Sequence, residues 1–232
     1  LSRRLCELGS QVIVPTRDPL RAAALFQAFG LADRATVIGG GVEEYDVVER
    51  LLREFRIETV FHLAAQTQVG QADRVPRATF ETNIRGTWNV LEAVRVAAPE
   101  ADVVLASSAS VYGNWGTGLA TEEGATPARR PYAVSKRCAE LLGQCAAHTH
   151  GLACGIVRAS NLYGPGDLNL GRLIPATIHA VLRGEPPVIT ASGTATRDFL
   201  YVDDAVQGYL RLAETLRTAA GGLSSWCSHA RT

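Results

Sequence analysis

The stretch from Val103 to Lys136 reads VVLASSASVYG over residues 103–113 and PYAVSK over residues 131–136. The first segment predicts a buried strand that ends in serines. In the second, Tyr132 and Lys136 stand four residues apart, so a helix would place both side chains on one face, about one turn apart. An ammonium group near a phenol lowers the phenol pKa from its usual value of about 10. The pattern therefore predicts Tyr132 as a base near neutral pH, with Ser108 beside it.

These two segments together are more specific than either one alone. A tyrosine and a lysine four residues apart occur often by chance, but a strand ending in SSASVYG and followed by PYAVSK does not. The sequence resembles the extended short-chain dehydrogenase/reductase family of NAD(P)-dependent nucleotide-sugar epimerases and dehydratases, over about residues 1–217. The resemblance implies that Ser108, Tyr132 and Lys136 are the catalytic residues, and that Tyr112 is not.

The composition is that of an ordinary globular protein. Of the 232 residues, 47% are hydrophobic and 20% are charged, and 23 Lys and Arg balance 23 Asp and Glu. This balance argues against nucleic acid or an anionic membrane as a partner. The sequence contains neither an apolar run of about 18 residues nor a visible signal peptide, so we expect a cytoplasmic protein. The five cysteines lack metal-ligand spacing, and we expect no metal site.

Alternating strand and helix patterns predict an α/β fold with a doubly wound, Rossmann-like parallel sheet. We expect strands at 11–14, 36–38, 59–65, 102–106 and 152–157, and helices at 19–29, 45–56, 79–98, 132–150, 172–183 and 204–217. The resemblance divides the chain into an NAD(P)-binding domain (1–160), a partial substrate-binding region with one helix returning to the core (161–217), and an unstructured tail (218–232).

The start of the sequence departs from this fold pattern. A doubly wound fold begins with a strand and a glycine-rich turn before its first helix, whereas this sequence opens on an amphipathic helical segment ending near Gly9 and contains no methionine. We therefore expect a fragment that lacks the first strand and phosphate-binding loop, and part of the substrate domain. We expect this chain alone to be poorly stable and to bind NAD(P) weakly or not at all. A non-catalytic remnant stays an alternative.

Two early positions bear on the choice of cofactor. Arg17 stands where an acid would hold the ribose hydroxyls of NAD, which favours the 2′-phosphate of NADP, although a solvated turn residue is an equally good interpretation. In the family, an aspartate usually precedes the residue that matches Val42 and holds the adenine amine. Gly41 stands there instead, which puts the adenine contact in doubt.

The resemblance extends the cofactor site along the chain. The segment HLAA at residues 62–65 matches a family motif at the nicotinamide-ribose side, and NIRGTWNVL at residues 83–91 matches another. We interpret His62 as a strand histidine with ordinary hydrogen bonds, and Asn83 as an amide that orders the catalytic helix. The implied NAD(P)-binding set is Arg17, Val42, Leu63, Ala64, Ala65, Asn83, Tyr132 and Lys136.

A nucleotide-sugar is the substrate that the resemblance implies. Gln66 begins a loop that would border it, and Ser108 would hold its reacting oxygen. Asn161 lies in a segment similar to the family's RxxNxYGP, and would donate to the substrate pyrophosphate. Arg197 lies in one similar to RDFxxVxD, and suits a bidentate phosphate contact.

The reaction that we favour is epimerisation through a 4-keto sugar. Tyr132 would take the proton of a sugar hydroxyl, and Lys136 would lower the tyrosine pKa and bind the ribose. Family members that eliminate water carry acidic residues directly after the matching serine or threonine, but here Ala109 and Ser110 stand in those positions. A 4,6-dehydratase stays the alternative, because residues 161–167 and 197–204 most resemble the CDP-glucose 4,6-dehydratase branch. A steroid-type dehydrogenase is less favoured.

The resemblance also implies a homodimer. Its interface would be a helix bundle that includes the predicted helices at 79–98 and 132–150.

Overall fold

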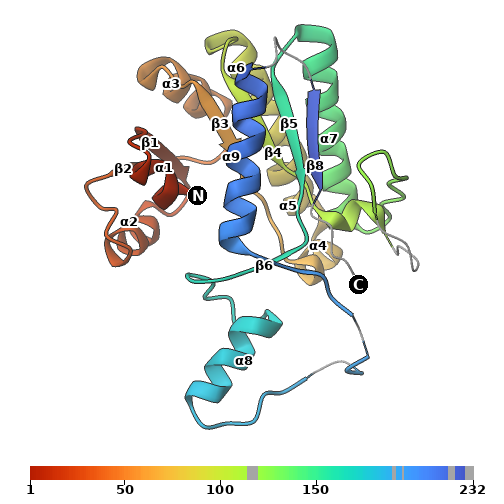
Figure 1. The fold of residues 1–232 in the computed structure, drawn as a ribbon. Helices are drawn as coiled ribbons and strands as arrows, with labels where there is room; N and C mark the ends of the chain where they lie inside the picture. The colour runs from red at the N-terminus through yellow and green to blue at the C-terminus, as the bar shows by residue number, and fades with distance from the viewer. Residues whose placement is uncertain (114–119, 190–191, 195, 219–222, 228–232) are drawn as a thin grey trace.

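The computed structural model describes residues 1–113, 120–189, 192–194, 196–218 and 223–227. Within these residues, all paired strands run parallel to each other (Figure 1). This confirms the α/β class with a Rossmann-like parallel arrangement. Within those residues, no strand joins β1 to β3. The described strands form three sheets. The largest has the order β3 (Thr59–His62), β4 (Asp102–Ala106), β5 (Cys154–Arg158) and β8 (Leu223–Cys227). The other two are pairs: β1 (Val12–Thr16) with β2 (Ala35–Gly39), and β6 (Asn161–Tyr163) with β7 (Phe199–Tyr201).

Helices cover both faces of the four-stranded sheet, with α9 in front and α6 and α7 behind it in Figure 1. Successive side chains of a strand point to opposite faces. Val103 and Leu105 therefore pack with α6 and α7, while Val104 packs against α9. The described helices are α1 (Ser2–Glu7), α2 (Pro19–Ala28), α3 (Tyr45–Phe55), α4 (Val69–Arg74), α5 (Pro76–Phe80), α6 (Gly86–Ala97), α7 (Pro131–His150), α8 (Leu173–Leu182) and α9 (Val202–Thr218).

Helix α7 packs closely against the sheet at Gly143. A Cβ atom at Gly143 would lie 2.5 Å from Leu105 Cδ1 and 3.0 Å from Cys154 Sγ, so only glycine allows this approach. Pro131 occupies the first turn, where its missing N–H costs nothing, and Gly151 ends the helix with φ 71°. This packing holds the first turn of α7 at the carboxyl end of β4.

The predicted helix over 79–98 lies within one uninterrupted helical segment, which contains a π turn that the sequence did not predict. The structure has α5, then a π-helical turn η1 (Glu81–Arg85), and then α6. The Thr87 hydroxyl donates to the Asn83 carbonyl at 2.7 Å, and a Cβ atom at Gly86 would lie 2.6 Å from Val42 Cγ2. A π turn contains an extra residue, which apolar periodicity at 3.6 residues does not reveal.

The prediction of an unstructured tail over 218–232 is wrong. Thr218 ends α9, and β8 pairs with β5 from Cys154↔Leu223 to Arg158↔Cys227. The small and polar sequence there gives little strand signal, but the outer edge of β5 offers backbone groups that a neighbouring strand satisfies. Residues 219–222 and 228–232 lie outside the described part of the chain.

The segment between β5 and α9 leaves the sheet. Figure 1 shows α8 apart from the sheet, and none of its residues is buried. The chain then returns through β7 into α9, which contributes Tyr209, Leu212 and Leu216 to the core. No helix among the described residues combines the length and apolar character that crossing a bilayer requires.

Candidate active site

The structure brings Ser108, Tyr132 and Lys136 together at the carboxyl end of β4. Ser108 follows that strand and caps the short 3₁₀ helix η2 (Ala109–Tyr112), accepting from the Ser110 N–H at 3.2 Å. A side-chain hydrogen bond joins Ser108 to Tyr132 in the first turn of α7. One turn further, the Lys136 ammonium donates to the carbonyl of Ala106, the last residue of β4, at 2.7 Å.

The electrostatics of this group differ from the sequence prediction. Burial raises the pKa of Tyr132, and the hydrogen bond with Ser108 and the charge of Arg172 oppose that rise. Lys136 is not among the groups that act on the pKa of Tyr132, and its ammonium donates to the Ala106 carbonyl. Burial also lowers the pKa of Lys136 to about 8.

Asn83 joins the loop after β3 to the start of α7. Its amide donates to the Gln66 carbonyl at 3.0 Å and to Ser135 Oγ at 2.9 Å, and its oxygen accepts from the Gln66 N–H at 2.7 Å. The side chain is 2% exposed, and these bonds use both of its amide hydrogens. Asn83 is therefore placed to order the catalytic helix, whereas its predicted contact with a cofactor stays a prediction.

His62 has the ordinary role predicted for it. Its Nε2 lies 2.9 Å from Thr87 Oγ1, which itself donates to Asn83, so the imidazole nitrogen is the donor. Burial, followed by the charge of Lys136, lowers the pKa of His62 to about 3. The ring is neutral at physiological pH and serves the packing of β3.

The residues predicted to hold a cofactor lie at the carboxyl ends of β1, β2 and β3. Directly after β3, Leu63 is 44% exposed and Ala64 is also exposed. A short apolar surface of this kind fits a flat ring. After β2, the Val42 carbonyl accepts from Asn89 at 3.0 Å. After β1, Arg17 contacts Glu43, with Nη1 3.4 Å from Oε1.

The predicted substrate residues divide into two groups. Gln66, with its backbone bound to Asn83, lies beside the start of α7. Asn161 and Arg197 are exposed in the segment that leaves the sheet, where Asn161 N and Nδ2 both donate to the Asp198 carbonyl, at 3.2 and 3.1 Å. The Ala109 N–H donates to the Ala159 carbonyl at 3.0 Å, which keeps this segment next to Ser108.

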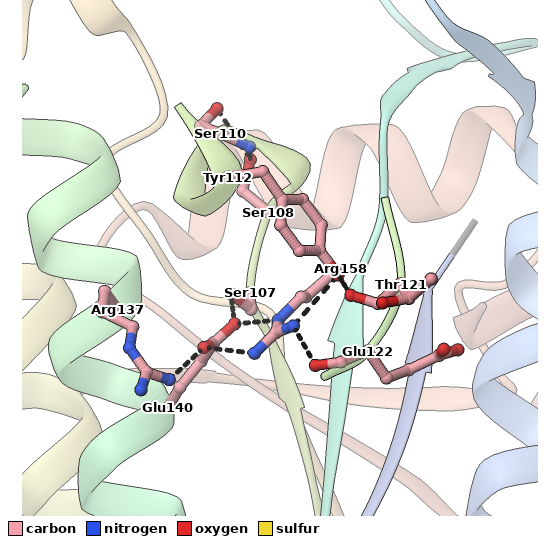
Figure 2. Close-up of polar contacts among 9 residues, drawn as sticks. All are labelled: Ser107, Ser108, Ser110, Tyr112, Thr121, Glu122, Arg137, Glu140 and Arg158. Carbon is pink, nitrogen blue, oxygen red and sulfur yellow. Dashed lines mark hydrogen bonds and ion pairs between the residues drawn. The ribbon is translucent and has the colours of Figure 1, made fainter. Parts of the chain in front are cut away.

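A buried ion pair lies beneath the catalytic group (Figure 2). Arg158, at the end of β5, donates to both carboxylate oxygens of Glu140 on α7, at 2.7 and 3.0 Å. The two residues are 6% and 1% exposed. Ser107, next to Ser108, donates to the same carboxylate at 2.6 Å, and Arg137 does so at 2.8 Å. Burial alone would raise the pKa of Glu140, but these hydrogen bonds outweigh it and hold the pKa below its usual value.

The remaining nitrogen of Arg158 reaches the other side of the site. Nη1 donates to Tyr112 Oη at 3.0 Å and to the Glu122 carbonyl at 2.8 Å, and Tyr112 donates to the Thr121 carbonyl at 2.9 Å. The guanidinium also lies 5.1 Å from the centre of the Tyr112 ring. Arg158 thus ties α7, η2 and the loop around Thr121 to one strand end, as Figure 2 shows.

This network has no counterpart among the residues predicted from the sequence. Two features of the sequence could have indicated the network. An arginine ends a continuous apolar strand, and a glutamate stands four residues after Lys136 on the same helix face. Charged residues in such positions are buried only when they are paired. Spacing did not show that these two are partners, because they are 18 positions apart on different elements.

Comparison with known proteins agrees with this geometry. Residues 1–223 match the family described as "NAD dependent epimerase/dehydratase family". The chain belongs to this family. CDP-glucose 4,6-dehydratase of Salmonella typhimurium is 30% identical over 97% of the chain, and UDP-glucose 4-epimerase of Mycolicibacterium smegmatis is 32% identical over 69%. The chain spans 65% and 52% of these two relatives.

Solved structures of the epimerase/dehydratase family share the fold. UDP-glucuronic acid 4-epimerase from Bacillus cereus, in complex with UDP-glucuronic acid and NAD, is 25% identical with a TM-score of 0.83. The alignment covers 99% of this chain and 74% of that one. The family therefore includes both reaction types considered from the sequence.

The ion pair leads to a prediction about stability in this family member. Glu140→Leu should lower the free energy of unfolding by about 3–5 kcal/mol, because Arg158 is then left buried without its partner. Glu140→Leu/Arg158→Leu should cost much less than the sum of the two single changes. Chemical denaturation measures all three. The matched control is the exposed pair of Arg95 and Glu92, with side chains 41% and 39% exposed, where the same cycle should give less than about 1 kcal/mol. Equal coupling in both pairs would contradict the prediction.

The second prediction concerns Lys136, which is the only lysine in the sequence. Protein labelled with ¹³C-lysine should give one ε-carbon resonance that titrates near pH 8, because burial disfavours the ammonium. The same resonance in urea should titrate near its usual 10.5. A folded-state midpoint above about 10 would show that the ammonium is not desolvated.

This pKa also affects stability. Since the folded pKa lies below the unfolded one, the folded protein binds fewer protons between about pH 8 and 10.5. The unfavourable contribution of Lys136 is thus complete below pH 8 and decreases as the pH rises to 10.5. The stability of the wild type relative to Lys136→Met should increase over that range.

Proposed function

We propose that this protein is a nucleotide-sugar epimerase that acts through a 4-keto intermediate. The observation that carries the proposal is the pair of residues after Ser108. Ala109 and Ser110 form the start of η2, and neither can serve as the acid or base that elimination of water requires. An epimerase needs only a base for the sugar hydroxyl, a donor for the keto oxygen and a cofactor.

A nicotinamide cofactor fits the residues at the strand ends. Leu63 and Ala64 offer an exposed apolar surface, and the charge of Lys136, on α7, acts on the preceding residue His62. Val42 and Arg17 would hold the adenosine end. A nicotinamide held there would supply a reversible hydride acceptor for oxidation of the sugar carbon and for its reduction on the other face.

The chain's own residues would handle the proton and the oxygen. Tyr132 would take the proton of the sugar hydroxyl, and Ser108 would donate to the oxygen as it becomes a carbonyl. Because burial raises the tyrosine pKa, the phenolate needs a nearby positive charge to form near neutral pH. The charge of Arg172 already acts in this direction, and in this proposal Lys136 adds a second charge by turning from the Ala106 carbonyl when the site is filled.

A nucleotide-sugar 4,6-dehydratase is the second candidate. It is supported by the 30% identity to CDP-glucose 4,6-dehydratase, which extends over 97% of the chain. The two candidates share the oxidation of the sugar and differ in the fate of the 4-keto intermediate.

We assign the substrate pyrophosphate to the region after β5. Asn161 and Arg197 are both exposed, and the pairing of β6 with β7 places their segments side by side. In this assignment, residues 1–160 hold the cofactor and residues 161–217 contribute to the sugar nucleotide site. The charge and planar shape of Arg197 suit a phosphate group.

We also propose a homodimer that forms through α6 and α7. These helices pack on each other and expose Trp88 (59%), Val96 (40%) and Leu141 (49%). Exposed aromatic and aliphatic side chains on adjacent helices are typical of the core of an interface.

The catalytic assignment predicts the effect of a single substitution. Tyr132→Phe should lower kcat at least about a hundredfold, the usual scale for removal of a positioned base. Steady-state turnover of a nucleotide-hexose measures this. Tyr45→Phe, on α3, is the control and should stay near the wild-type rate. Near-normal turnover by Tyr132→Phe would remove this residue from the mechanism.

The reaction type can be tested in deuterated water. Incubation with nucleotide-hexoses and NAD⁺ should give an epimer without deuterium at C5, because no residue after Ser108 can exchange that proton. Mass spectrometry and NMR of the product provide the readout. A 6-deoxy-4-keto product with deuterium at C5 would refute the epimerase and establish the dehydratase.

A further inference from the structure

Three consecutive residues where β4 ends each form a hydrogen bond with α7. These bonds join Ala106 to Lys136, Ser107 to Glu140 and Ser108 to Tyr132. The three helix residues are spaced four positions apart, so they lie on one face of α7. Lys136 and Tyr132 take part in the proposed reaction, whereas the bond between Ser107 and Glu140 has no assigned part in it.

The backbone of this segment is bound to β5, and the side chain of Ser107 binds it to α7. The Ser107 N–H donates to the Val157 carbonyl at 2.8 Å, and the Ala109 N–H donates to the Ala159 carbonyl at 3.0 Å. These bonds fix the spacing between the two strand ends, but they do not fix the distance from β4 to the helix. The hydroxyl of Ser107, which lies 2.6 Å from the Glu140 carboxylate, acts in that second direction.

Ser107 and Ser108 point in different directions. Val103 and Leu105 pack on the side of α7, and Ser107 continues this alternation, with only 8% of the residue exposed. The backbone of Ser108 is extended, with φ −157° and ψ 146°, so its side chain leaves on the opposite side from that of Ser107. Because the two residues are joined by one planar peptide bond, a rotation of the chain at Ser107 also turns the hydroxyl of Ser108.

The acceptor of the Ser107 bond cannot follow a displaced strand. Glu140 is 1% exposed, and both of its carboxylate oxygens accept from Arg158 on β5, at 2.7 and 3.0 Å. A movement of this carboxylate would leave the buried Arg158 charge unpaired, which is costly. Ser107 is therefore bound to a fixed point, and its bond transmits the position of the ion pair to the next residue.

We propose that Ser107 is a positioning residue, which through its bond to Glu140 holds the end of β4 at the distance from α7 that keeps Ser108 aligned with Tyr132 during proton transfer. The proposal rests on the proposed function, in which Ser108 and Tyr132 handle the sugar hydroxyl. Ser107 contacts neither substrate nor cofactor in this account, and it acts only through Ser108. A displacement of about 1 Å can lower a rate about a hundredfold, so the loss of one buried hydroxyl is enough to be measured.

The experiment compares Ser107→Ala, Ser108→Ala and the double variant in steady-state turnover of UDP-glucose, CDP-glucose and dTDP-glucose, each with NAD⁺. Ser107→Ala should lower kcat at least about tenfold and leave KM within about twofold, because the binding contacts are kept while the alignment of Ser108 is lost. Ser108→Ala should lower kcat about a hundredfold or more. The double variant should be slower than Ser108→Ala by no more than about twofold, because Ser107 then has nothing left to position.

A second readout needs no turnover. The Ser110 N–H donates to the Ser108 hydroxyl oxygen at 3.2 Å, so the Ser110 amide resonance in a ¹⁵N-correlated spectrum reports where that oxygen lies. Ser107→Ala should shift this resonance towards its position in Ser108→Ala. Thermal melts check that each variant is folded. Ser107→Cys, which fills the space but donates only weakly, repeats both measurements without leaving a cavity.

Arg137→Gln is the matched control. Arg137 donates to the same carboxylate at 2.8 Å, but it belongs to α7 and its side chain is 28% exposed. Its replacement should leave kcat within about twofold of the wild type and the Ser110 resonance unmoved, since the link between β4 and α7 is kept.

The outcomes distinguish this proposal from the proposed function. The role of Ser107 is refuted, and the proposed function stands, if folded Ser107→Ala keeps its kcat or if the losses of the two single variants multiply in the double variant. An equal effect of Arg137→Gln also refutes it. If the wild type turns over none of the three sugar nucleotides, the failure lies in the proposed function. The Ser110 resonance then decides the positioning role, which an unmoved resonance in Ser107→Ala refutes.

Discussion

The buried ion pair between Arg158 and Glu140 is the interaction on which the geometry of the candidate site depends. Both charges are withdrawn from water, which is tolerable only because their polar atoms are satisfied. Glu140 receives hydrogen bonds from three side chains, and Arg158 also binds Tyr112 and the Glu122 carbonyl. Displacement of either partner would leave several buried groups unpaired. The ends of β4 and β5, the helix α7 and the loop around Thr121 are consequently held as one unit.

This unit explains how the residues of the candidate site are held in position. Ser107 binds the carboxylate, so Ser108 is held at the end of β4, and Lys136 binds the last carbonyl of the same strand. Lys136 and Glu140 are one helical turn apart on α7. A single turn therefore fastens the helix to β4 through one residue and to β5 through the other. Tyr132 lies one turn before them, with its orientation set by the helix.

The π turn η1 connects this catalytic unit to the cofactor end. Thr82 binds Glu43 after β2, and its neighbour Asn83 binds Ser135 on α7 and Gln66 after β3. In a regular α-helix, adjacent residues point about 100° apart, and a π turn alters that relation locally. Two consecutive side chains of η1 thus contact the segments after β2 and β3 and the start of α7.

The sequence by itself determined the α/β class and most of the elements, because those depend on local information. Apolar runs identified β4 and β5, and the four-residue spacing of Tyr132 and Lys136 placed them on one helix face. The π turn within the helix and the strand β8 were not predictable, since one depends on an inserted π residue and the other on the open edge of β5.

Only the tertiary structure decided the partners of the charged groups. It paired Arg158 with Glu140 and Arg17 with Glu43, and directed Lys136 to a backbone carbonyl instead of to Tyr132. Such choices depend on burial and on which groups meet across elements far apart in the chain. Neither composition nor spacing contains that information, because the cost of an unpaired buried charge arises only once the fold has closed around it.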